Sequence, residues 1–265
     1  MNRIDAKNAL LKKNKKKAFV AYITAGFPNT AVTEKLIPVL EKNGADFIEL
    51  GMPFSDPIAD GPTIQKSSYI ALKNGMTMNK FFRLVRNVRK KSQVPLIMMT
   101  YYNLIYNYGF KRFAEIARKS GLDGVIVPDL PIEEAQDLNE NLRSEKISLI
   151  FLISPVTEKS RMKKISKVSE GFIYYVSLTG VTGVRDKLPD DLVENVRLIK
   201  NVTKKPVYVG FGVSTSEQVK QVSETADGVI VGSAIIKAIT ENYGKKDFLK
   251  KVGRFIAALS KGVNG

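Results

Sequence analysis

The chain has 265 residues, 44% of them hydrophobic, and a mean hydropathy of -0.10, values of an ordinary globular protein rather than a disordered one. It contains no cysteine and no histidine, which excludes disulfides, thiol catalysis and cysteine metal sites and leaves acid/base work to Asp, Glu, Lys or Tyr. The 42 basic and 26 acidic residues give a net charge of +16, an excess that is mostly lysine and spread along the chain. We interpret it as a solvated surface rather than a nucleic-acid site.

The first 22 residues contain a basic run, residues 12–17, and lack the continuous apolar core of a secretory signal. No other stretch is apolar over the length that crosses a bilayer, so no membrane helix is predicted. We therefore expect a cytoplasmic protein, or one of the plastid stroma if it is organelle-encoded.

Eight short apolar runs recur along the chain and are rich in Val, Ile, Phe and Tyr, which is typical of buried strands. They lie at residues 18–24, 46–51, 95–101, 124–129, 148–154, 172–177, 206–212 and 228–233.

Segments with apolar spacing near 3.6 residues lie between these runs and predict amphipathic helices. They include residues 33–42, 110–119, 133–143, 190–200 and 216–222. Helix starts are indicated by Asn29 or Thr30, by Pro131 before Glu133 and Glu134, and by Ser214 with Glu217 as a capping box.

Alternating strands and helices predict a single (β/α)8 barrel domain over residues 1–265, with a doubly wound open sheet as the alternative. Three strands begin after similar phrases, GADFIEL, GLDGVIV and TADGVIV, a weak repeat that favours one barrel over two domains. Additional short helices are expected at residues 2–11, after the second strand at 62–74, and after the eighth at 233–241.

Glycines follow the last three strands: Gly180 and Gly183, then Gly210 and Gly212, then Gly232 before Ser233. In a barrel, the loops after the strands carry the chemistry, and a phosphate site is expected around the last two of them. Glycine lets backbone N–H groups approach an oxyanion, and a helix start adds donors. The three signals together predict a phosphate site.

The motif IELGMPFSDPIADGPTIQ gathers three carboxylates at the end of the second strand. Strand alternation puts Glu49 on the side of Phe47, and we expect it to face the barrel mouth, because an unpaired charge between strand and helix would be costly. Asp60 is a candidate for catalysis or for a helix cap, whereas Asp56 in Ser-Asp-Pro fits an ordinary turn. The residues predict carboxylate acid/base chemistry on a small phosphorylated molecule, without a recognisable metal site.

The same motif resembles the signature of the tryptophan synthase alpha chain family. The resemblance extends from AFVAYITAGFP through MTYYN, VIVPDLP, FLISP, SLTGVTG and GFGVS to VGSAIIK, nearly the full length. It implies a (β/α)8 barrel that cleaves indole-3-glycerol phosphate to indole and glyceraldehyde 3-phosphate in a retro-aldol reaction, with no cofactor of its own.

By motif position, the resemblance implies that Glu49 is the general acid/base and that Asp60 binds the indole N–H and stabilises the cationic indolenine. It implies phosphate binding at Gly183, Gly212, Gly232 and Ser233. It implies a substrate pocket formed by Tyr22, Met99, Tyr101, Ile126, Ile153, Tyr174, Thr182 and Phe211. Thr182 would reach Asp60 from a lid over residues 177–189.

The resemblance also implies a partner, the pyridoxal-phosphate-dependent tryptophan synthase beta chain, in an αββα tetramer. Pro53, Asp56 and Asn103 resemble positions at that interface. Three alternatives remain: a stand-alone lyase that releases free indole, a catalytically silent barrel that only activates a beta chain, and a nucleic-acid-binding protein. The strongly basic balance is unusual for such a subunit and leaves a further anionic partner open.

Overall fold

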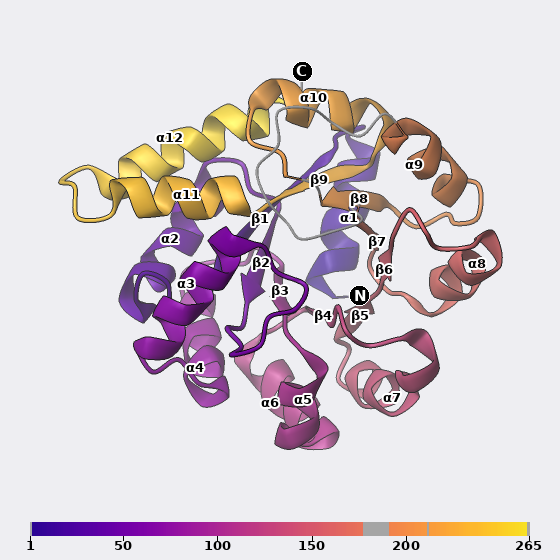
Figure 1. Ribbon diagram of the computed structural model, residues 1–265, viewed down its shortest axis with the longest axis horizontal. Coiled ribbons are helices and arrows are strands. Elements are labelled where there is room, and N and C mark those ends of the chain that lie inside the picture. The colour runs from indigo at the N-terminus through magenta and orange to yellow at the C-terminus, as the bar shows by residue number, and fades with distance from the viewer. Residues whose placement is uncertain (1, 177–190, 211, 264–265) are drawn as a thin grey trace.

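Nine parallel strands form one sheet at the centre of the computed structural model, which describes residues 2–176, 191–210 and 212–263 (Figure 1). The strands follow the order β5-β4-β3-β2-β1-β9-β8-β7-β6. Their bounds are β1 (Ala18–Thr24), β2 (Phe47–Gly51), β3 (Leu96–Met99), β4 (Gly124–Ile126), β5 (Ser148–Ile150), β6 (Leu152–Ile153), β7 (Ile173–Val176), β8 (Val207–Gly210) and β9 (Gly228–Val231).

The two edge strands of this order, β5 and β6, are separated in the chain by Phe151 alone. The sheet therefore curls into a barrel, and the predicted fifth strand is divided between its two edges. The eight predicted strand positions and the (β/α)8 fold are confirmed.

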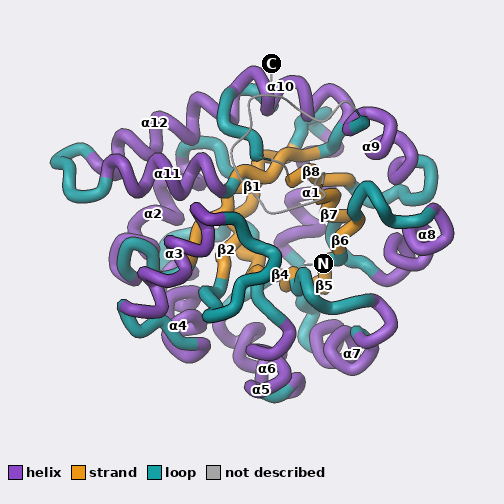
Figure 2. The backbone as a smooth tube through the Cα atoms, viewed as in Figure 1, coloured by secondary structure: helices purple, strands orange, loops and turns teal. Residues whose placement is uncertain are grey.

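Helices surround the strands, as the ring of purple segments in Figure 2 shows. They are α1 (Arg3–Lys13), α2 (Thr30–Lys42), α3 (Pro62–Lys73), α4 (Met78–Arg89), α5 (Tyr102–Tyr108), α6 (Phe110–Ser120), α7 (Gln136–Ser144), α8 (Lys159–Val168), α9 (Leu192–Lys200), α10 (Ser216–Thr225), α11 (Ser233–Asn242) and α12 (Phe248–Lys261), with a 3-10 turn at η1 (Ile132–Glu134). The three additional helices are confirmed as α1, α3 and α11. Within the described ranges, no helix has the length and apolar character needed to cross a membrane.

Two of the predicted helix starts differ in detail from the structure. The capping box of α10 pairs Thr215 with Gln218 rather than Ser214 with Glu217, because the helix begins one residue later and puts Gln218 at its third position. The segment after Pro131 first forms the 3-10 turn and only then α7. Asn29 caps α2 as expected, with its Oδ1 accepting from Val32 N at 2.9 Å.

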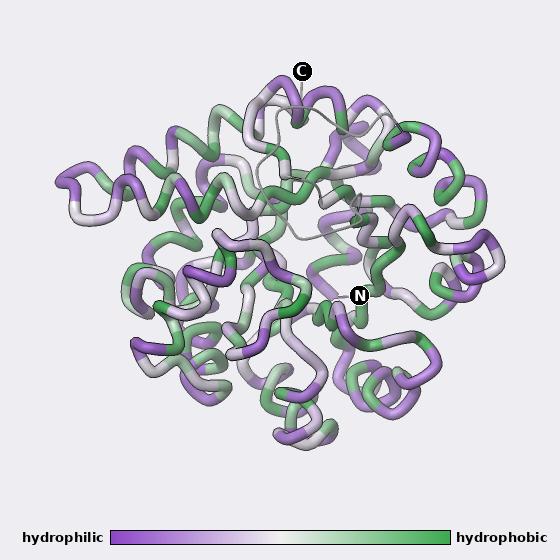
Figure 3. The backbone as a smooth tube through the Cα atoms, viewed as in Figure 1, coloured by the Kyte–Doolittle hydropathy of each residue, from purple (hydrophilic) through white to green (hydrophobic). Residues whose placement is uncertain are grey.

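Buried side chains form two layers, one inside the barrel and one between the strands and the helices. Phe47 belongs to the inner cluster, whereas Ile48 and Leu50 belong to the outer one. This alternation within β2 means that Glu49, two residues after Phe47, faces the inside. In the helices, hydrophobic and hydrophilic residues alternate around the axis (Figure 3), which matches burial of one face against the strands.

Helix α1 closes the amino-terminal end of the barrel and lies behind the strands in Figure 1. Ile4 is fully buried in the inner cluster. A Cβ at Gly124 or Gly171 would come within 2.7 or 2.8 Å of its side chain, so these glycines make room for the helix. Asn8 Nδ2 donates to Gly171 O at 2.8 Å.

Each of the three repeated phrases places an aspartate at this end of the barrel: Asp46, Asp123 and Asp227. Each carboxylate accepts a hydrogen bond from a backbone N–H at the start of the neighbouring strand. The donors are Phe19, Leu96 and Val207, at 3.1, 2.9 and 3.0 Å. The repeat thus marks a strand-pairing site that ties adjacent strands together.

Asp123 is the most buried of the three, with 1% of its side chain exposed, and it also accepts from Arg3 and Arg89. We predict that Asp123→Ala lowers the free energy of unfolding by about 3–5 kcal/mol, because the nearly buried Arg89 guanidinium loses the carboxylate that balances its charge. Urea unfolding measures the loss. The matched change Asp137→Ala, on the exposed face of α7, is expected to cost less than about 1 kcal/mol. Equal losses in the two variants would contradict the importance of the buried pair.

Candidate active site

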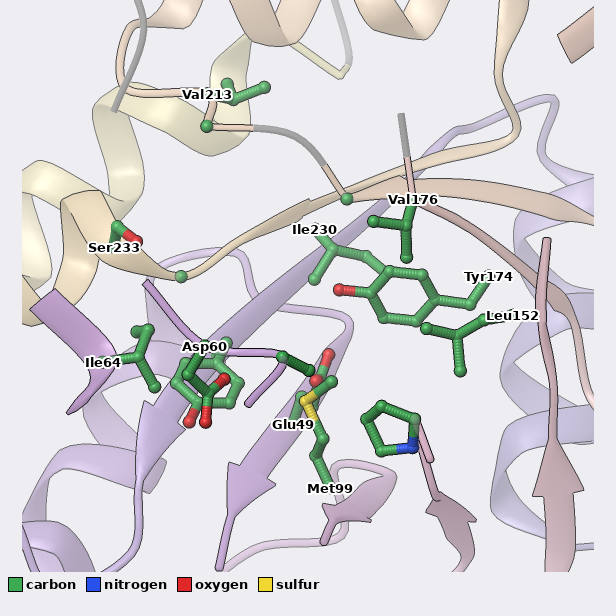
Figure 4. Close-up of a pocket in the computed structure, with 16 residues that line it drawn as sticks. Glu49, Asp60, Ile64, Met99, Leu152, Tyr174, Val176, Val213, Ile230 and Ser233 are labelled. Atoms are coloured by element: carbon green, nitrogen blue, oxygen red, sulfur yellow. The ribbon is translucent and has the colours of Figure 1, made fainter. Parts of the chain in front are cut away.

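A cavity of about 120 Å³ opens at the carboxyl ends of the strands, the end of a barrel where active sites form (Figure 4). Most of its wall is apolar, and its polar groups are few. Its lining consists of Tyr22, Glu49, Ala59, Asp60, Ile64, Met99, Pro128, Leu152, Tyr174, Val176, Gly210, Gly212, Val213, Ile230, Gly232 and Ser233. An apolar chamber with a few convergent polar groups is what small-molecule sites have in common.

Glu49 projects from β2 into this cavity and is 1% exposed. Neither of its carboxylate oxygens has a hydrogen-bond partner among the described residues. Burial, with a further contribution from the charge of Asp60, raises the pKa of Glu49 to about 8. At neutral pH this carboxyl is therefore mostly protonated and can donate a proton.

Asp60 lies in the loop between β2 and α3, and its carboxyl points into the same cavity (Figure 4). The Tyr101 hydroxyl holds this loop: it accepts from Ala59 N at 3.0 Å and donates to Asp60 Oδ2 at 3.2 Å. Burial raises the pKa of Asp60 to about 6, and the hydrogen bond from Tyr101 opposes that rise. At neutral pH Asp60 is mostly ionised, so the two carboxyls differ in protonation state.

Two tyrosines form the walls beside Glu49, and each lies against a glycine of a neighbouring strand. A Cβ on Gly51 would lie 2.1 Å from the Tyr22 hydroxyl, and one on Gly210 would lie 2.6 Å from the Tyr174 hydroxyl. These glycines therefore make space for the rings. Burial raises the pKa of both phenols well above the usual range, so they remain neutral and can donate hydrogen bonds.

The start of α11 forms another part of the cavity wall. Gly232 is the residue before the helix and Ser233 is its first residue, and Gly212 lines the wall after β8. The unpaired backbone N–H groups of a helix start and its positive dipole end suit a phosphate group. The structure thus brings three of the four predicted phosphate residues to the cavity that holds both carboxyls.

Comparison with known proteins identifies the family. Residues 8–263 match the family model described as tryptophan synthase alpha chain. The chain is 47% identical to the tryptophan synthase alpha chain of Geobacter sp. (strain M21) and 46% identical to that of Geobacter sulfurreducens, with 98% and 99% of those proteins covered by 99% of this chain. The chain belongs to the tryptophan synthase alpha chain family.

Solved structures agree with this assignment. Tryptophan synthase subunit alpha from Legionella pneumophila superposes with a TM-score of 0.92 at 41% identity, over 100% of this chain and 99% of that one. A structure of Mycobacterium tuberculosis tryptophan synthase gives 0.91 at 32% identity, over 99% and 98% of the two chains. The chain is thus a subunit of tryptophan synthase rather than a stand-alone indole-releasing lyase, and its reaction is the cleavage of indole-3-glycerol phosphate in tryptophan biosynthesis.

The remaining pocket residues implied by the family resemblance are placed unevenly. Tyr22, Met99 and Tyr174 line the cavity. Tyr101 does not line it but donates a hydrogen bond to Asp60, which does. Ile126 lies in the inner cluster without lining the cavity, and Ile153 lies in the outer cluster, since strand alternation turns Leu152 inward instead. Gly183, Thr182 and Phe211, with the whole 177–189 lid, lie outside the described residues.

Several lining residues were not foreseen, notably Leu152, Val176 and Ile230. Alternation from Tyr174 would have found Val176, and the parallel register of Leu152 with Tyr174 places it beside that ring.

Of the predicted interface residues of this alpha chain, Asp56 and Asn103 are exposed and Pro53 is buried, and none lines the cavity.

Replacing Glu49 by glutamine is predicted to stabilise the protein at high pH. The folded-state pKa of about 8 lies above the ordinary value of 4.5, so the folded state binds the proton more tightly than the unfolded state does. Stability from this group is complete below about pH 4.5 and is lost as pH rises toward 8, by at most about 1.4 kcal/mol per pH unit. The midpoint temperature of Glu49→Gln minus that of the native protein should therefore grow from pH 5 to pH 8. A constant difference would contradict the raised pKa.

Proposed function

We propose that Glu49 and Asp60 carry out the cleavage of indole-3-glycerol phosphate from opposite protonation states. The observation that carries this proposal is the pair of carboxyls in one cavity, the buried Glu49 with a pKa of about 8 and the partly buried Asp60 with a pKa of about 6. Pairs of groups whose environments separate their pKa values assign the acid and the anion of a reaction.

The reaction needs a proton delivered to the indole carbon at the bond that breaks. Glu49, protonated before the reaction, donates that proton, and the ring becomes an indolenine with positive charge on nitrogen. The Glu49 carboxylate then takes the proton of the glycerol hydroxyl as its oxygen becomes the aldehyde oxygen. The electron pair of the broken carbon–carbon bond returns to the ring and restores neutral indole, and Glu49 regains its proton.

Asp60 stabilises the charged intermediate. It accepts a hydrogen bond from the ring N–H, which becomes more acidic when the ring is protonated at carbon. A fixed anion in a site with little water stabilises that cation more than it stabilises the neutral substrate, so it lowers the barrier. The Tyr101 hydroxyl keeps the anion in place.

Phosphate anchoring by Gly212, Gly232 and Ser233, together with Gly183, would hold the glycerol phosphate at the α11 side of the cavity. Tyr22, Met99 and Tyr174 would then pack against the indole. The family resemblance implies Phe211 and Thr182 for the same pocket, and both lie outside the described residues. Ile126 would contribute from the inner cluster and Ile153 from the outer cluster, rather than through direct contact.

The chain is proposed to act as one domain, residues 1–265, without a cofactor of its own. Its partner would be the beta chain, which supplies pyridoxal phosphate, in an αββα tetramer of the cytoplasm. Asp56 and Asn103 are exposed beside Ile58 and Tyr106, whose side chains are 78% and 63% exposed. Exposed apolar side chains near the cavity mouth suit a protein partner.

Indole release from indole-3-glycerol phosphate, measured with and without a beta chain, tests the proposal. We expect Glu49→Gln to abolish release, a loss of at least about 1,000-fold, while binding of glycerol phosphate survives, because only the proton donor is removed. Asp60→Asn should cost about 100-fold or more in kcat. Turnover retained by Glu49→Gln would refute its role. A native chain that activates a beta chain but never releases indole would instead support a silent barrel.

The pH dependence of kcat/KM provides a separate check. Activity should rise as pH passes about 6, where Asp60 ionises, and fall above about 8, where Glu49 loses its proton. Tyr101→Phe removes the hydrogen bond that lowers the pKa of Asp60, so the acidic limb should move to higher pH while the alkaline limb changes less. An acidic limb that stays in place, with activity merely scaled down, would count against this clamp.

A further inference from the structure

A strongly basic hollow of about 430 Å³ lies at the amino-terminal end of the barrel, opposite the active-site cavity. We call it the lysine hollow. It opens beside the starts of β1 and β8, and the seven residues of β1 separate it from the mouth by roughly 20 Å. Its lining consists of Asn8, Leu11, Lys12, Lys15, Lys16, Lys17, Lys200, Thr203, Lys204, Lys205, Pro206, Tyr208 and Asp227.

The fold, rather than the local sequence, creates this concentration of charge. The hollow joins the basic run at the end of α1 to the segment after α9, and the Tyr208 hydroxyl donates to Asn8 Oδ1 across 200 positions of sequence. Seven lysines face one carboxylate there, whereas the whole chain has 42 basic and 26 acidic residues. A generally lysine-rich surface does not account for that ratio.

The single carboxylate is already occupied. Asp227 contacts Lys200 at 2.8 Å and Lys17 at 3.7 Å, and it accepts from Val207 N at 3.0 Å. Lys205 is held by Ser166 O at 2.7 Å. These contacts fix part of the wall, and the lining still holds more lysines than its one carboxylate can pair.

The ammonium groups that remain belong to Lys12, Lys15, Lys16 and Lys204. Within the described ranges none of the four makes an ion pair, and all four residues are exposed. Like charges gathered within a Debye length repel one another, so an anion in the hollow would be bound favourably.

The turn that presents two of these lysines is well defined. Lys15 N donates to Lys12 O at 3.1 Å and Lys16 N to Leu11 O at 2.9 Å, the Schellman arrangement at the end of a helix. Lys15 has a φ of 54°, in the left-handed region where glycine is favoured and other residues cost roughly 1 kcal/mol. A lysine at this position places an ammonium at the hollow where a glycine would place none.

We propose that the lysine hollow binds a small anion carrying two or more linked phosphate groups, such as tripolyphosphate, free or as part of a nucleoside triphosphate. A single phosphate carries at most two charges at neutral pH and would leave most of the excess unpaired. Lysine binds phosphate as a point charge, and no arginine in the described lining offers the planar fork that suits a carboxylate. The volume lies in the range of small-molecule sites.

Calorimetric titration of the full chain with tripolyphosphate tests the proposal, in saturating glycerol phosphate so that the proposed phosphate site at the mouth is filled. The triple variant K15Q/K16Q/K204Q should bind at least tenfold more weakly than the native chain. The matched variant K245Q/K250Q/K251Q removes the same charge from exposed positions around α12 and should lose less than about twofold. Equal losses in both would show only a diffuse charge effect and overturn the site.

Lys15→Gly separates binding from folding, because it relaxes the left-handed backbone while it removes one ammonium. We expect a higher midpoint temperature together with weaker tripolyphosphate binding. Inorganic phosphate that binds as tightly as tripolyphosphate would refute the need for linked phosphates. An RNA of about 20 nucleotides that binds more tightly, with a steep salt dependence, would replace the proposal with a nucleic-acid surface. Equal affinities for tripolyphosphate and ATP would identify the phosphate chain itself as the bound group, whereas tighter ATP would add a contact with the nucleoside.

Discussion

The Glu49 carboxyl is buried without a hydrogen-bond partner among the described residues, and the rest of the site depends on this constraint. An ionised carboxylate in that position would cost several kcal/mol, and the protein avoids the cost by keeping the proton. Asp123 at the other end of the barrel is equally buried but accepts from two guanidinium groups and a backbone N–H. The same barrel thus holds one buried acid that is fully paired and supports the fold, and another, without a partner among the described residues, to which the proposed function assigns the chemistry.

Under the proposed function, this contrast explains how a chain without histidine would transfer protons near neutral pH. The apolar wall around Glu49, with two tyrosines that remain neutral, raises the pKa of this glutamate into the range where imidazole normally titrates. Asp60 is less buried and is hydrogen-bonded by Tyr101, so it remains the anion of the pair. Glycines in the neighbouring strands leave the space that the two tyrosine rings occupy.

Much of this arrangement could be predicted from the sequence, because it follows from period-two alternation in the strands and from the turn residues that separate strands and helices. The eight apolar runs predicted the strands, and the cost of an unpaired charge between strand and helix predicted that Glu49 points inward, on the side of Phe47. The pocket role of Ile153 came from the family resemblance, whereas alternation through Leu149 and Phe151 puts this residue in the outer cluster. The pKa of Glu49 depends on burial, which only the folded chain provides. The repeat around Asp46, Asp123 and Asp227 was visible, but its purpose appeared only once each strand had a neighbour. The lysine hollow was invisible for the same reason: charges spread through the chain come together only in the fold.

The break at Phe151 has a consequence for how the ring is closed. Each pair of neighbours in the sheet order is joined by a ladder of hydrogen bonds, but β5 and β6, at the two ends of that order, are successive pieces of one chain. The ring therefore closes through one continuous strand, which hydrogen-bonds to β4 along its first half and to β7 along its second. Leu152 lies in the second half, where its register partner is Tyr174, so the change of neighbour at Phe151 puts these two side chains side by side in the wall of the mouth.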